Sequence, residues 1–346
     1  MAKSVFIGMS GGVDSSVAAY ILKEQGYDVT GVTMRLCDNY VKSFDSSNIE
    51  ASKSVCEKLH IDFKDIDCRD AFKKYVVKPF IATYEKGATP NPCVECNKRI
   101  KFDLLNNGDN MIATGHYAII EFADSRYKLR KSTNLQKDQS YFLYALSQDI
   151  LSKVIFPLGE MDKEQVREIA EKQGFINAHK KDSQDICFIP DGDYASFITN
   201  NSNAKYPEGN FVDINGNILG KHKGIIHYTI GQRKGLGLSL KKPMYVSKLD
   251  MERNEVVLVS DDELFSNELT VTDFNWLSIE NPEKPFRALG RIRYRHKESP
   301  CTVTPNLDGT VEVVFDEPQR AITTGQSLVL YDEKTASYVL GGGTII

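Results

Sequence analysis

The sequence contains no apolar run of about 18 or more residues, and it therefore predicts no transmembrane helix. Its first residues enter a strand-like segment almost at once. They show neither the apolar core nor the small-residue cleavage site of a secretory signal. Its seven cysteines are an odd number in a long chain without an export signal, which argues against a disulfide scaffold. We therefore expect a cytoplasmic protein whose cysteines are reduced.

An excess of positive charge is also lacking. The formal net charge is −4, so a protein-wide field that attracts nucleic acid is absent, and contact with RNA would have to come from local basic clusters. The apolar fraction of 41% and the charged fraction of 26% are typical of globular proteins. A length of 346 residues suffices for two or three domains.

The first part of the chain alternates strand and helix patterns. Strands are predicted at residues 4–9, 28–34, 61–66 and 110–114, and helices at residues 14–25, 49–59, 71–85, 163–173 and 193–200. Residues 87–97, which contain two prolines, are predicted to form a loop, and residues 201–209 a linker. This alternation is typical of an α/β domain with a parallel sheet and helices on both faces.

Beyond about residue 205 the pattern changes to short strands separated by turns. A repeated Asn-Gly predicts a hairpin within residues 212–219. Further strands are predicted at residues 244–249, 255–259, 269–274, 287–296, 301–304, 310–315 and 327–331. We expect an α/β protein with a parallel-sheet domain (residues 1–203), a small β-rich central domain (residues 204–266) and a C-terminal β-barrel (residues 267–346).

The sharpest local signal is the segment SGGVDSS at residues 10–16, between the first predicted strand and the first predicted helix. Gly11 and Gly12 allow the backbone to take positive φ and to approach an anion closely. The N–H groups at the helix start bind phosphate, and Ser10, Ser15 and Ser16 add hydroxyl donors. Asp14 is a candidate to hold Mg²⁺ or to orient a glycine N–H.

Two common glycine-rich motifs are absent from this loop. It lacks G-x-x-x-x-G-K-[ST], which disfavours a kinase-like or GTPase loop, and G-x-G-x-x-G, which disfavours dinucleotide binding. An ordinary glycine-rich turn is the remaining alternative, and the strand–loop–helix context disfavours it. The segment resembles the PP-loop of the N-type ATP pyrophosphatases. These enzymes bind ATP through its triphosphate, adenylate an oxygen and release pyrophosphate.

Two cysteine-containing segments narrow this resemblance. They are residues 89–102 (TPNPCVECNKRIKF) and 181–190 (KDSQDICFIP), accompanied by residues 113–117 (ATGHY) and 137–140 (KDQS). Together they resemble the tRNA-specific 2-thiouridylases of the MnmA/TrmU family, and the resemblance extends along the whole chain. It implies a tRNA-uridine 2-sulfurtransferase that adenylates the C2 oxygen of the wobble uridine. The sulfur comes from a cysteine persulfide, and AMP and pyrophosphate are released.

The resemblance also implies site residues and partners. Cys96 corresponds to the nucleophile and Cys187 to the persulfide carrier. ATP with Mg²⁺ is expected at Gly8, Met9, Ser10, Gly11, Gly12, Val13, Asp14, Ser15, Ser16, Met34 and Gly115. The tRNA is expected at Asn91, Pro92, Cys93, His116, Lys137, Asp138, Gln139, Arg293, Tyr294, Arg295 and Gln326. The target base would be flipped out of its stack beside residues 91–93. The implied partners are tRNAs of the Lys, Glu and Gln type and a cysteine desulfurase or sulfur-relay protein, with no membrane partner.

The residues around Cys96 support a reactive thiol. Lys98, Arg99 and Lys101 follow it, and nearby cations lower the pKa of a thiol and favour the thiolate that sulfur transfer needs. The alternative for Cys96 and Cys187 is a pair of buried, inert cysteines, which their predicted loop positions disfavour. Cys56 in a helical pattern and Cys301 in a strand pattern are expected to be small buried hydrophobic residues.

One position departs from the family pattern. Position 93 is often aspartate in this family and is Cys93 here, which removes a candidate acid/base group. The change creates C-x-x-C with Cys96, and Cys187 supplies a third thiol. A [4Fe–4S] cluster held by these three cysteines is therefore an alternative, whereas C-x-x-C without a second pair is weak evidence for zinc. The resemblance favours the persulfide route without a metal.

Five basic residues in the β tail form a candidate RNA contact. In a strand over residues 287–296, alternate side chains share a face, which would form a basic stripe of Arg287, Arg291, Arg293, Arg295 and Lys297. Such a stripe suits contacts with phosphates. The alternative is a solvated face with ion pairs to nearby acids. For His116, spacing alone favours a structural histidine with satisfied hydrogen bonds.

Two other functions remain open from the sequence. One is a PP-loop ligase that acts on a small metabolite, which would leave the cysteine segments and the basic β tail without a role. The other is an RNA-binding or sulfur-carrier protein without catalysis, which would not need a triphosphate loop. Pyrophosphate release that requires both ATP and tRNA would distinguish the thiolating enzyme from both.

Overall fold

The computed structural model describes residues 2–37, 46–106, 108–180 and 186–346. Its first part contains a five-stranded sheet in the order β3-β2-β1-β4-β7, in which all neighbouring strands are parallel. The strands are β1 (Ser4–Gly8), β2 (Asp28–Arg35), β3 (Asp62–Asp67), β4 (Met111–Ala113) and β7 (Val154–Ile155). The predicted parallel sheet is confirmed, and β7 is an edge strand that the sequence patterns did not predict.

Helices cover both faces of this sheet. Val5 and Ile7 of β1 are fully buried in one apolar core with α1 (Val13–Glu24), α2 (Ser46–Leu59) and α8 (Lys163–Lys172). Phe6 points to the other face, where a second core contains side chains of the remaining helices. Those helices are α3 (Arg69–Phe72), the π-helical turn η2 (Lys73–Val77), α4 (Lys78–Glu85), α5 (Pro92–Cys96), the π-helical turn η3 (Asn97–Lys101), α6 (Phe102–Leu105), α7 (Gln148–Leu151) and α9 (Tyr194–Asn201). No helix among the described residues is long and apolar enough to span a bilayer.

The prediction of a loop over residues 87–97 is wrong at its C-terminal end. The chain becomes helical at Pro92 and continues through α5, η3 and α6 to Leu105. Proline is favoured in the first turn of a helix because its missing N–H would have no intrahelical partner there. Pro92 therefore begins a helix where the sequence analysis used it as a loop signal.

A four-stranded sheet in the order β10-β11-β8-β9 forms the central part. Its strands are β8 (Gly209–Val212), β9 (Ile218–His222), β10 (Tyr245–Asp250) and β11 (Glu255–Val259), with short 3-10 turns η5 (Ile225–His227) and η6 (Asp261–Leu264). The predicted hairpin is confirmed, since β8 and β9 are antiparallel. Asp213 fixes its turn by accepting hydrogen bonds from the backbone N–H groups of Asn215 and Asn217, both at 2.9 Å.

The C-terminal part is a closed six-stranded barrel, as predicted. It comprises β12 (Phe265–Trp276), β13 (Phe286–Arg291), β14 (Ser299–Pro305), β15 (Val311–Arg320), β16 (Ser327–Tyr331) and β17 (Tyr338–Ile345). The order β12-β15-β14-β13-β16-β17 closes because β17 also pairs with β12. Cys301, on β14, is fully buried in the barrel core, and Cys56 is fully buried on α2, so both predictions are confirmed.

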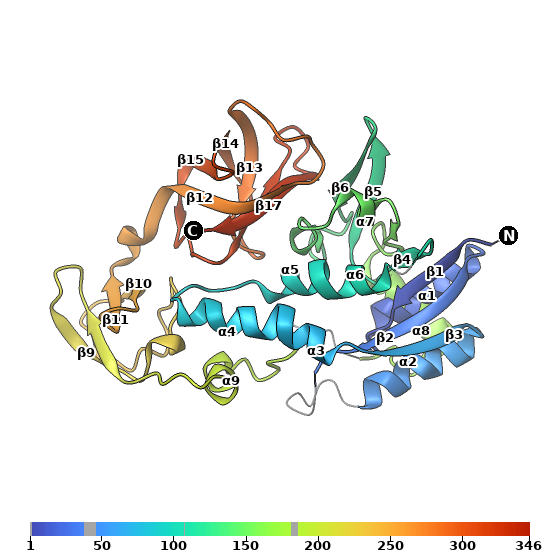
Figure 1. The fold of residues 1–346 in the computed structure, drawn as a ribbon, viewed down its shortest axis with the longest axis horizontal. Coiled ribbons are helices and arrows are strands. Elements are labelled where there is room, and N and C mark those ends of the chain that lie inside the picture. The colour runs from blue at the N-terminus through green and yellow to red at the C-terminus, as the bar shows by residue number, and fades with distance from the viewer. Residues whose placement is uncertain (1, 38–45, 107, 181–185) are drawn as a thin grey trace.

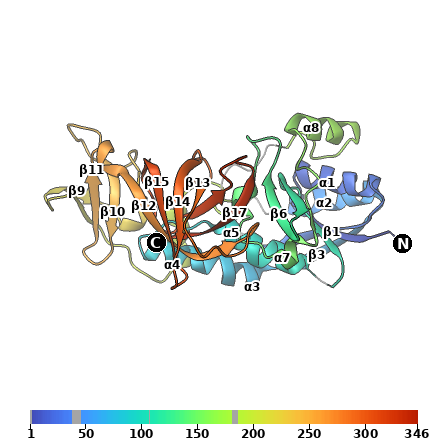
Figure 2. The same cartoon turned by 90° about the horizontal axis from the view of Figure 1, so that it is seen from above.

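An unpredicted hairpin from the first part extends the barrel sheet. Strands β5 (Ala118–Ala123) and β6 (Arg126–Lys131) follow β4, and β6 pairs antiparallel with β17. The Tyr338 hydroxyl donates to Glu121 Oε2 at 2.7 Å across this junction. The barrel consequently lies between the N-terminal sheet and the central part, beside the α5–α6 helix (Figures 1 and 2). The division at residues 203 and 266 stays a prediction.

Candidate active site

The SGGVDSS loop lies at the carboxyl end of β1, where the strand order reverses. The chain proceeds from β1 to β2 and β3 on one side, and then to β4 and β7 on the other. In open α/β sheets this reversal opens a crevice in which ligands bind. Gly11 has φ of 71°, and a Cβ there would lie 2.6 Å from the backbone oxygen of Asn48. Any other residue at position 11 would be strained by the positive φ, and its Cβ would clash with the backbone of Asn48.

The hydroxyl groups of the loop hold its shape. Ser15 Oγ accepts from the backbone N–H of Ser10 at 3.2 Å, and the Ser10 hydroxyl accepts from the N–H of Gly12 at 3.3 Å. Gly12 is the extended N-cap of α1, and its carbonyl accepts from the hydroxyls of Ser15 and Ser16, both at 3.1 Å. The N-terminus of this twelve-residue helix therefore faces the crevice.

Two residues that the sequence analysis missed support the loop from outside. Asn177 Nδ2 donates to the carbonyl of Gly11 at 3.1 Å and to Ser16 Oγ at 3.0 Å. Lys180 Nζ donates to the same carbonyl at 3.2 Å and places a cation beside the loop. Asn177 is 4% exposed, and its Oδ1 is a buried acceptor without a hydrogen-bond partner. Both residues lie just past the glycine-terminated helix α8, which offers no motif that would have identified them.

Asp14 has partners from two other elements. Its carboxylate accepts from the Tyr117 hydroxyl at 2.8 Å and forms an ion pair with Lys163 Nζ at 2.8 and 2.9 Å. Lys163 is the first residue of α8, and Tyr117 follows β4. The carboxylate is thereby fixed at the crevice. No group of three or more His, Cys, Asp or Glu side chains suited to a metal ion occurs in the part of the chain that the structure describes.

Met34 and Gly115 flank the loop from the neighbouring strands. Met34 lies near the carboxyl end of β2 and is 8% exposed. Gly115 follows β4, and a Cβ there would lie 2.8 Å from the backbone nitrogen of Ser15. Gly115 therefore permits the strand end to contact the start of α1. The structure brings the predicted nucleotide-binding residues together at one edge of the sheet, and their role stays a prediction.

The thiols gather at the same edge. Cys93 is exposed on α5, and Cys96 is buried at the end of that helix. Cys187 is exposed and follows residues 181–185, which lie outside the described residues. The electrostatic neighbours of Cys187 include Cys96, Cys93 and Cys37. Cys68 follows β3, donates its N–H to the Arg35 carbonyl at 2.9 Å, and neighbours Cys96.

Cys37 and Cys68 were not singled out from the sequence. Each lies just beyond a predicted strand. Because the carboxyl ends of parallel strands meet at one edge of the sheet, the sequence could have indicated that both cysteines lie near the site.

Burial dominates the acidity of these thiols. Desolvation raises the pKa of Cys96 to about 11. Although much of residue Cys187 is exposed, its thiol is surrounded by protein, and desolvation raises its pKa to about 12. Desolvation also raises the pKa of Cys93. The predicted lowering of the Cys96 pKa is therefore wrong, because loss of water outweighs the cations. Lys101 is the cation that opposes the shift at all three thiols.

His116 lies near Lys101, and its imidazole ring is neutral. Desolvation, and then Lys101, lower the pKa of His116 well below its ordinary value. Its Nδ1 is 2.7 Å from the Thr114 hydroxyl, and its ring packs between Phe102 and Phe156 with centroid distances of 6.1 and 6.0 Å. This packing fits the structural histidine that spacing alone favours, and contact with tRNA stays a prediction.

The barrel reaches the cysteine helix through Gln326. Its Nε2 donates to the carbonyls of Thr89 at 3.0 Å and Pro90 at 3.2 Å. The N–H of Thr89 donates to the Thr324 carbonyl at 2.9 Å. The barrel therefore fixes the segment that leads to Asn91, Pro92 and Cys93.

A second contact joins the barrel to residues 137–139. The Tyr294 hydroxyl donates to the backbone carbonyl of Asp138 at 3.0 Å. The Asp138 side chain is 3% exposed and accepts from the Ser140 hydroxyl at 2.8 Å, and Gln139 Oε1 accepts from the N–H of Tyr117 at 3.0 Å. Asp138 and Gln139 thus use their side chains within the protein, while Lys137 lies partly exposed beside them. All three stay predicted tRNA contacts.

The predicted basic stripe does not exist as a strand face. Strand β13 ends at Arg291, and residues 292–296 form bends and a turn. Arg287 forms ion pairs with Asp316 at 2.6 Å and Glu333 at 3.3 Å, and Arg291 pairs with Glu298 at 3.3 Å. The alternative of ion pairs with nearby acids is therefore correct for these two arginines.

The later members of the predicted stripe lie in the turns. Arg293 donates to the Ala321 carbonyl, whereas Arg295 and Lys297 are exposed. The prediction failed because it extended the strand period past the point where the chain turns.

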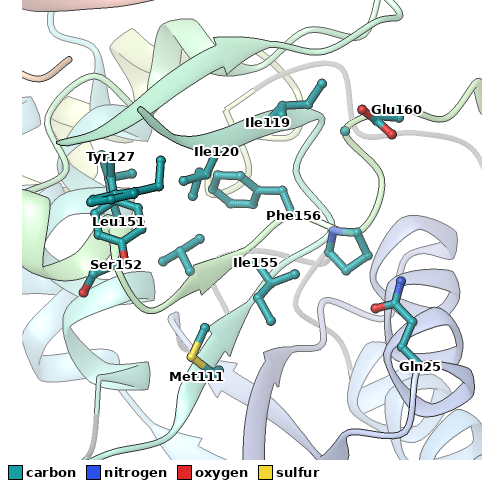
Figure 3. Close-up of a pocket in the computed structure, with 14 residues that line it drawn as sticks. Gln25, Met111, Ile119, Ile120, Tyr127, Leu151, Ser152, Ile155, Phe156 and Glu160 are labelled. Carbon is teal, nitrogen blue, oxygen red and sulfur yellow. The ribbon is translucent and has the colours of Figure 1, made fainter. Parts of the chain in front are cut away.

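A pocket of about 500 Å³ lies elsewhere, between β7 and the β5–β6 hairpin (Figure 3). Its lining includes Ile119, Ile120, Tyr127 and Leu151, and none of the predicted site residues. Phe156 also lines it and contacts His116 from the other side. The pocket is separate from the sheet edge that holds the loop and the thiols.

Comparison with known proteins covers nearly the whole chain. The family model of the tRNA methyl transferase HUP domain matches residues 3–191, that of the tRNA methyl transferase PRC-barrel domain residues 195–260, and that of the aminomethyltransferase beta-barrel domain residues 266–345. A tRNA-specific 2-thiouridylase MnmA of Clostridium botulinum is 48% identical over 355 residues, which cover 99% of this chain and 98% of that protein. Its counterpart in Acetivibrio thermocellus is 49% identical over 358 residues, covering 99% of each.

Among solved structures, the U34-tRNA thiolase NcsA from Methanococcus maripaludis with its [4Fe-4S] cluster aligns with a TM-score of 0.36 at 21% identity. The alignment covers 57% of this chain and 66% of that one, and a similarity this low carries no argument about the chemistry. The agreement along the full length with the thiouridylases is the decisive finding. The chain belongs to the MnmA family of tRNA-specific 2-thiouridylases.

Proposed function

We propose that the protein is an ATP-dependent tRNA-uridine 2-sulfurtransferase that converts the wobble uridine to 2-thiouridine. One observation carries the proposal beyond family membership: the glycine–serine loop and the thiols of Cys96 and Cys187 share the carboxyl edge of one parallel sheet. The two halves of the reaction, activation of an oxygen and delivery of sulfur, are thereby available to one uridine.

The loop residues fit a nucleotide triphosphate. Gly11 and Gly115 let the neighbouring backbone pack closely against the loop, the N-terminus of α1 faces the crevice, and Lys180 adds a positive charge. When bound, ATP with Mg²⁺ supplies the adenylyl group that turns the C2 oxygen of uridine into a leaving group, with release of pyrophosphate. Asp14 is the acidic side chain of the loop and the candidate to face the metal ion.

The thiols supply the sulfur. Cys187 carries a persulfide whose terminal sulfur attacks C2, and AMP departs with the original oxygen. The Cys96 thiolate then attacks Sγ of Cys187, which breaks the bond to the transferred sulfur and leaves 2-thiouridine and a Cys96–Cys187 disulfide. Because burial raises the pKa of both thiols, Lys101 is the group that favours their anionic forms.

The substrate and partners are part of the proposal. We infer that tRNAs of the Lys, Glu and Gln type bind across the cysteine helix and the barrel turn that carries Tyr294 and Arg295. A cysteine desulfurase or a sulfur-relay protein would charge Cys187, a residue that is partly exposed although its thiol is desolvated. Because tRNA and its charging enzymes are cytoplasmic, the reaction is placed in the cytoplasm.

The [4Fe–4S] alternative has less support. Cys93, Cys96 and Cys187 are electrostatic neighbours, yet the described residues offer no group of three or more His, Cys, Asp or Glu side chains arranged to hold a metal ion. We therefore derive no step through a cluster. Bound iron with acid-labile sulfide in an anaerobic preparation would contradict this conclusion.

The test combines purified protein with unmodified tRNA, Mg·ATP, cysteine and a cysteine desulfurase, followed by digestion of the tRNA and mass spectrometry. We expect 2-thiouridine from the wild type and none from Cys96→Ala or Cys187→Ala. Cys301→Ala, which changes a buried barrel cysteine, is the matched control and should retain product. Absence of both product and pyrophosphate from the wild type would instead support a metabolite ligase.

A further inference from the structure

Tyr117 lies between the nucleotide loop and the segment of residues 137–139. It follows the strand end that contacts the loop at Gly115, and it is 3% exposed. Its ring packs in the same apolar core as Val13 and Val17 of α1. Tyr117 is not among the residues expected to contact ATP or tRNA, so its role in the protein must come from the groups to which it is bonded.

The hydroxyl of Tyr117 fixes one side of the Asp14 carboxylate. It donates to Asp14 Oδ1 at 2.8 Å, while Lys163 Nζ donates to the same oxygen at 2.8 Å and to Oδ2 at 2.9 Å. A hydrogen bond to a charged group contributes about tenfold or more to an equilibrium constant. A ligand that reorients the Asp14 carboxylate must therefore either move the Tyr117 hydroxyl with it or break this bond.

The backbone of Tyr117 is bonded to Gln139 in both directions. The N–H of Tyr117 donates to Gln139 Oε1 at 3.0 Å, and the N–H of Gln139 donates to the Tyr117 carbonyl at 2.9 Å. Turns close the segment on both sides of Gln139. The N–H of Lys137 donates to the Asn134 carbonyl at 3.0 Å, and the N–H of Phe142 donates to the Gln139 carbonyl at 3.0 Å. A shift of Tyr117 is therefore passed on to this segment.

The barrel holds the same segment from the other side. The Tyr294 hydroxyl donates to the backbone carbonyl of Asp138 at 3.0 Å, and Asp138 is itself 3% exposed. Covalent and hydrogen bonds thus connect Asp14 in the nucleotide loop, through Tyr117 and residues 138–139, to the barrel turn. The two ends of this connection are the predicted sites for Mg·ATP and for tRNA.

We propose that Tyr117 is a positioning residue that makes nucleotide binding and tRNA binding depend on one another. This inference rests on the proposed function, in which Asp14 faces the metal ion of Mg·ATP and residues 137–139 contact tRNA. The hydroxyl of Tyr117 orients Asp14 and its backbone orients Gln139, so each ligand stabilises the arrangement that the other requires. Such coupling is reciprocal: tRNA tightens nucleotide binding by the same factor by which the nucleotide tightens tRNA binding.

Binding measurements on the full-length protein test the coupling. The protein is titrated with the magnesium complex of α,β-methylene-ATP, which cannot transfer its adenylyl group, alone and with saturating unmodified tRNA. For the wild type we expect tRNA to tighten nucleotide binding about tenfold. In Tyr117→Phe this factor should fall to about twofold or less, because the ring keeps its packing and only the bond to Asp14 is lost.

Tyr338→Phe is the matched control. It removes a hydroxyl that donates to Glu121 Oε2 at 2.7 Å, and the same carboxylate accepts from Arg130 Nε at 2.6 Å. This arrangement resembles that at Asp14, with a tyrosine hydroxyl and a cation on one carboxylate, but it lies outside the connection between the two sites. The coupling factor of Tyr338→Phe should equal that of the wild type.

The coupling factor separates the proposed role from a structural one. A general loss of stability in Tyr117→Phe would weaken nucleotide binding with and without tRNA alike and leave the factor at its wild-type value, which would overturn the proposal. A factor of about one in the wild type, or an equal loss of coupling in Tyr338→Phe, would also overturn it.

Steady-state kinetics with ATP give a second readout. At saturating tRNA the KM for ATP should rise about fivefold in Tyr117→Phe, while kcat for pyrophosphate release changes less than about twofold, because the lost interaction concerns binding. A lower kcat with an unchanged KM would refute the proposed role. Absence of both tRNA binding and 2-thiouridine in the wild type would instead refute the proposed function.

Discussion

Replacing Lys101 with methionine should make the buried thiols less reactive. Lys101 is the cation that lowers the pKa of Cys93, Cys96 and Cys187, against the larger effect of desolvation. It lies on the π-helical turn η3, which follows Cys96 directly. Methionine keeps the length and apolar stem of the side chain and removes the charge, so that the electrostatic contribution is isolated.

The expected size follows from the burial of Cys96. With a pKa of about 11, about one Cys96 in a thousand is a thiolate at pH 8, compared with about one in ten at the ordinary value of 9.0. For a separation of about 10 Å, a unit charge would contribute about 1.7 kcal/mol at an effective dielectric constant of about 20. Solvent screening of the partly exposed Lys101 reduces this, so we expect loss of about 1.4 kcal/mol, or a tenfold lower thiolate fraction.

The assay is the rate of alkylation of Cys96 by iodoacetamide, followed by mass spectrometry of the tryptic peptide that contains it, which spans residues 87–98 in the wild type and 87–99 in Lys98→Met. The wild-type rate should rise about tenfold per pH unit below the pKa, and Lys101→Met should lower it about tenfold at each pH. Lys98→Met is the matched control on the same turn and should leave the rate unchanged. Equal rates for Lys101→Met and wild type, or an equal loss in the control, would refute the reasoning. As an independent check, the His116 pKa should rise in Lys101→Met, because Lys101 lowers it in the wild type.

Two further substitutions test the nucleotide loop and the barrel junction. Gly115→Val should weaken ATP binding about tenfold or more in calorimetry, since a Cβ there would lie 2.8 Å from the backbone nitrogen of Ser15 and would displace the start of α1. Glu298→Gln should lower the free energy of unfolding by about 2–3 kcal/mol in urea titrations, because it leaves the buried Lys131 without its carboxylate partner at 2.8 Å. The pKa of Glu298 is lowered in the folded protein, so the stability that its carboxylate contributes should be fully present above pH 4.5, its ordinary pKa, and should be lost as the pH falls through the pKa of the folded state. Equal free energies of unfolding for the variant and the wild type at pH 7 would contradict this prediction.

The local features that the sequence predicted well are those that depend on short-range rules. The strand–loop–helix at residues 4–24 follows from an apolar run, two glycines and helical spacing, and the structure has all three. The hairpin of β8 and β9 follows from its turn residues. These features depend on neighbours in the sequence, so they can be recognised without knowledge of the tertiary fold.

The features that were missed depend on distant partners. Strand β6 is rich in basic residues, and its pairing with β17 is set by contacts that no local pattern contains. The acidity of Cys96 was predicted from the three cations that follow it, but its burial under other elements decides the pKa. Arg287 and Arg291 likewise find acidic partners on other strands and turns. A run of basic residues in a sequence therefore predicts neither the pKa of a neighbouring thiol nor an RNA-binding face, unless the burial of the site and its acidic partners are also known.

The pairing of β6 with β17 has a consequence for biosynthesis. Strand β6 leaves the ribosome long before β17 exists, since Arg130 and its partner Tyr338 are 208 residues apart in the sequence. Until the last residues emerge, the hairpin presents an open strand edge, which is prone to pairing with other chains. The bonds from Gln326 to the Thr89 segment also form only at that stage. A prematurely terminated chain would therefore carry its cysteines without the barrel that holds their helix, and release of the finished polypeptide is coupled to assembly of the sulfur-transfer site.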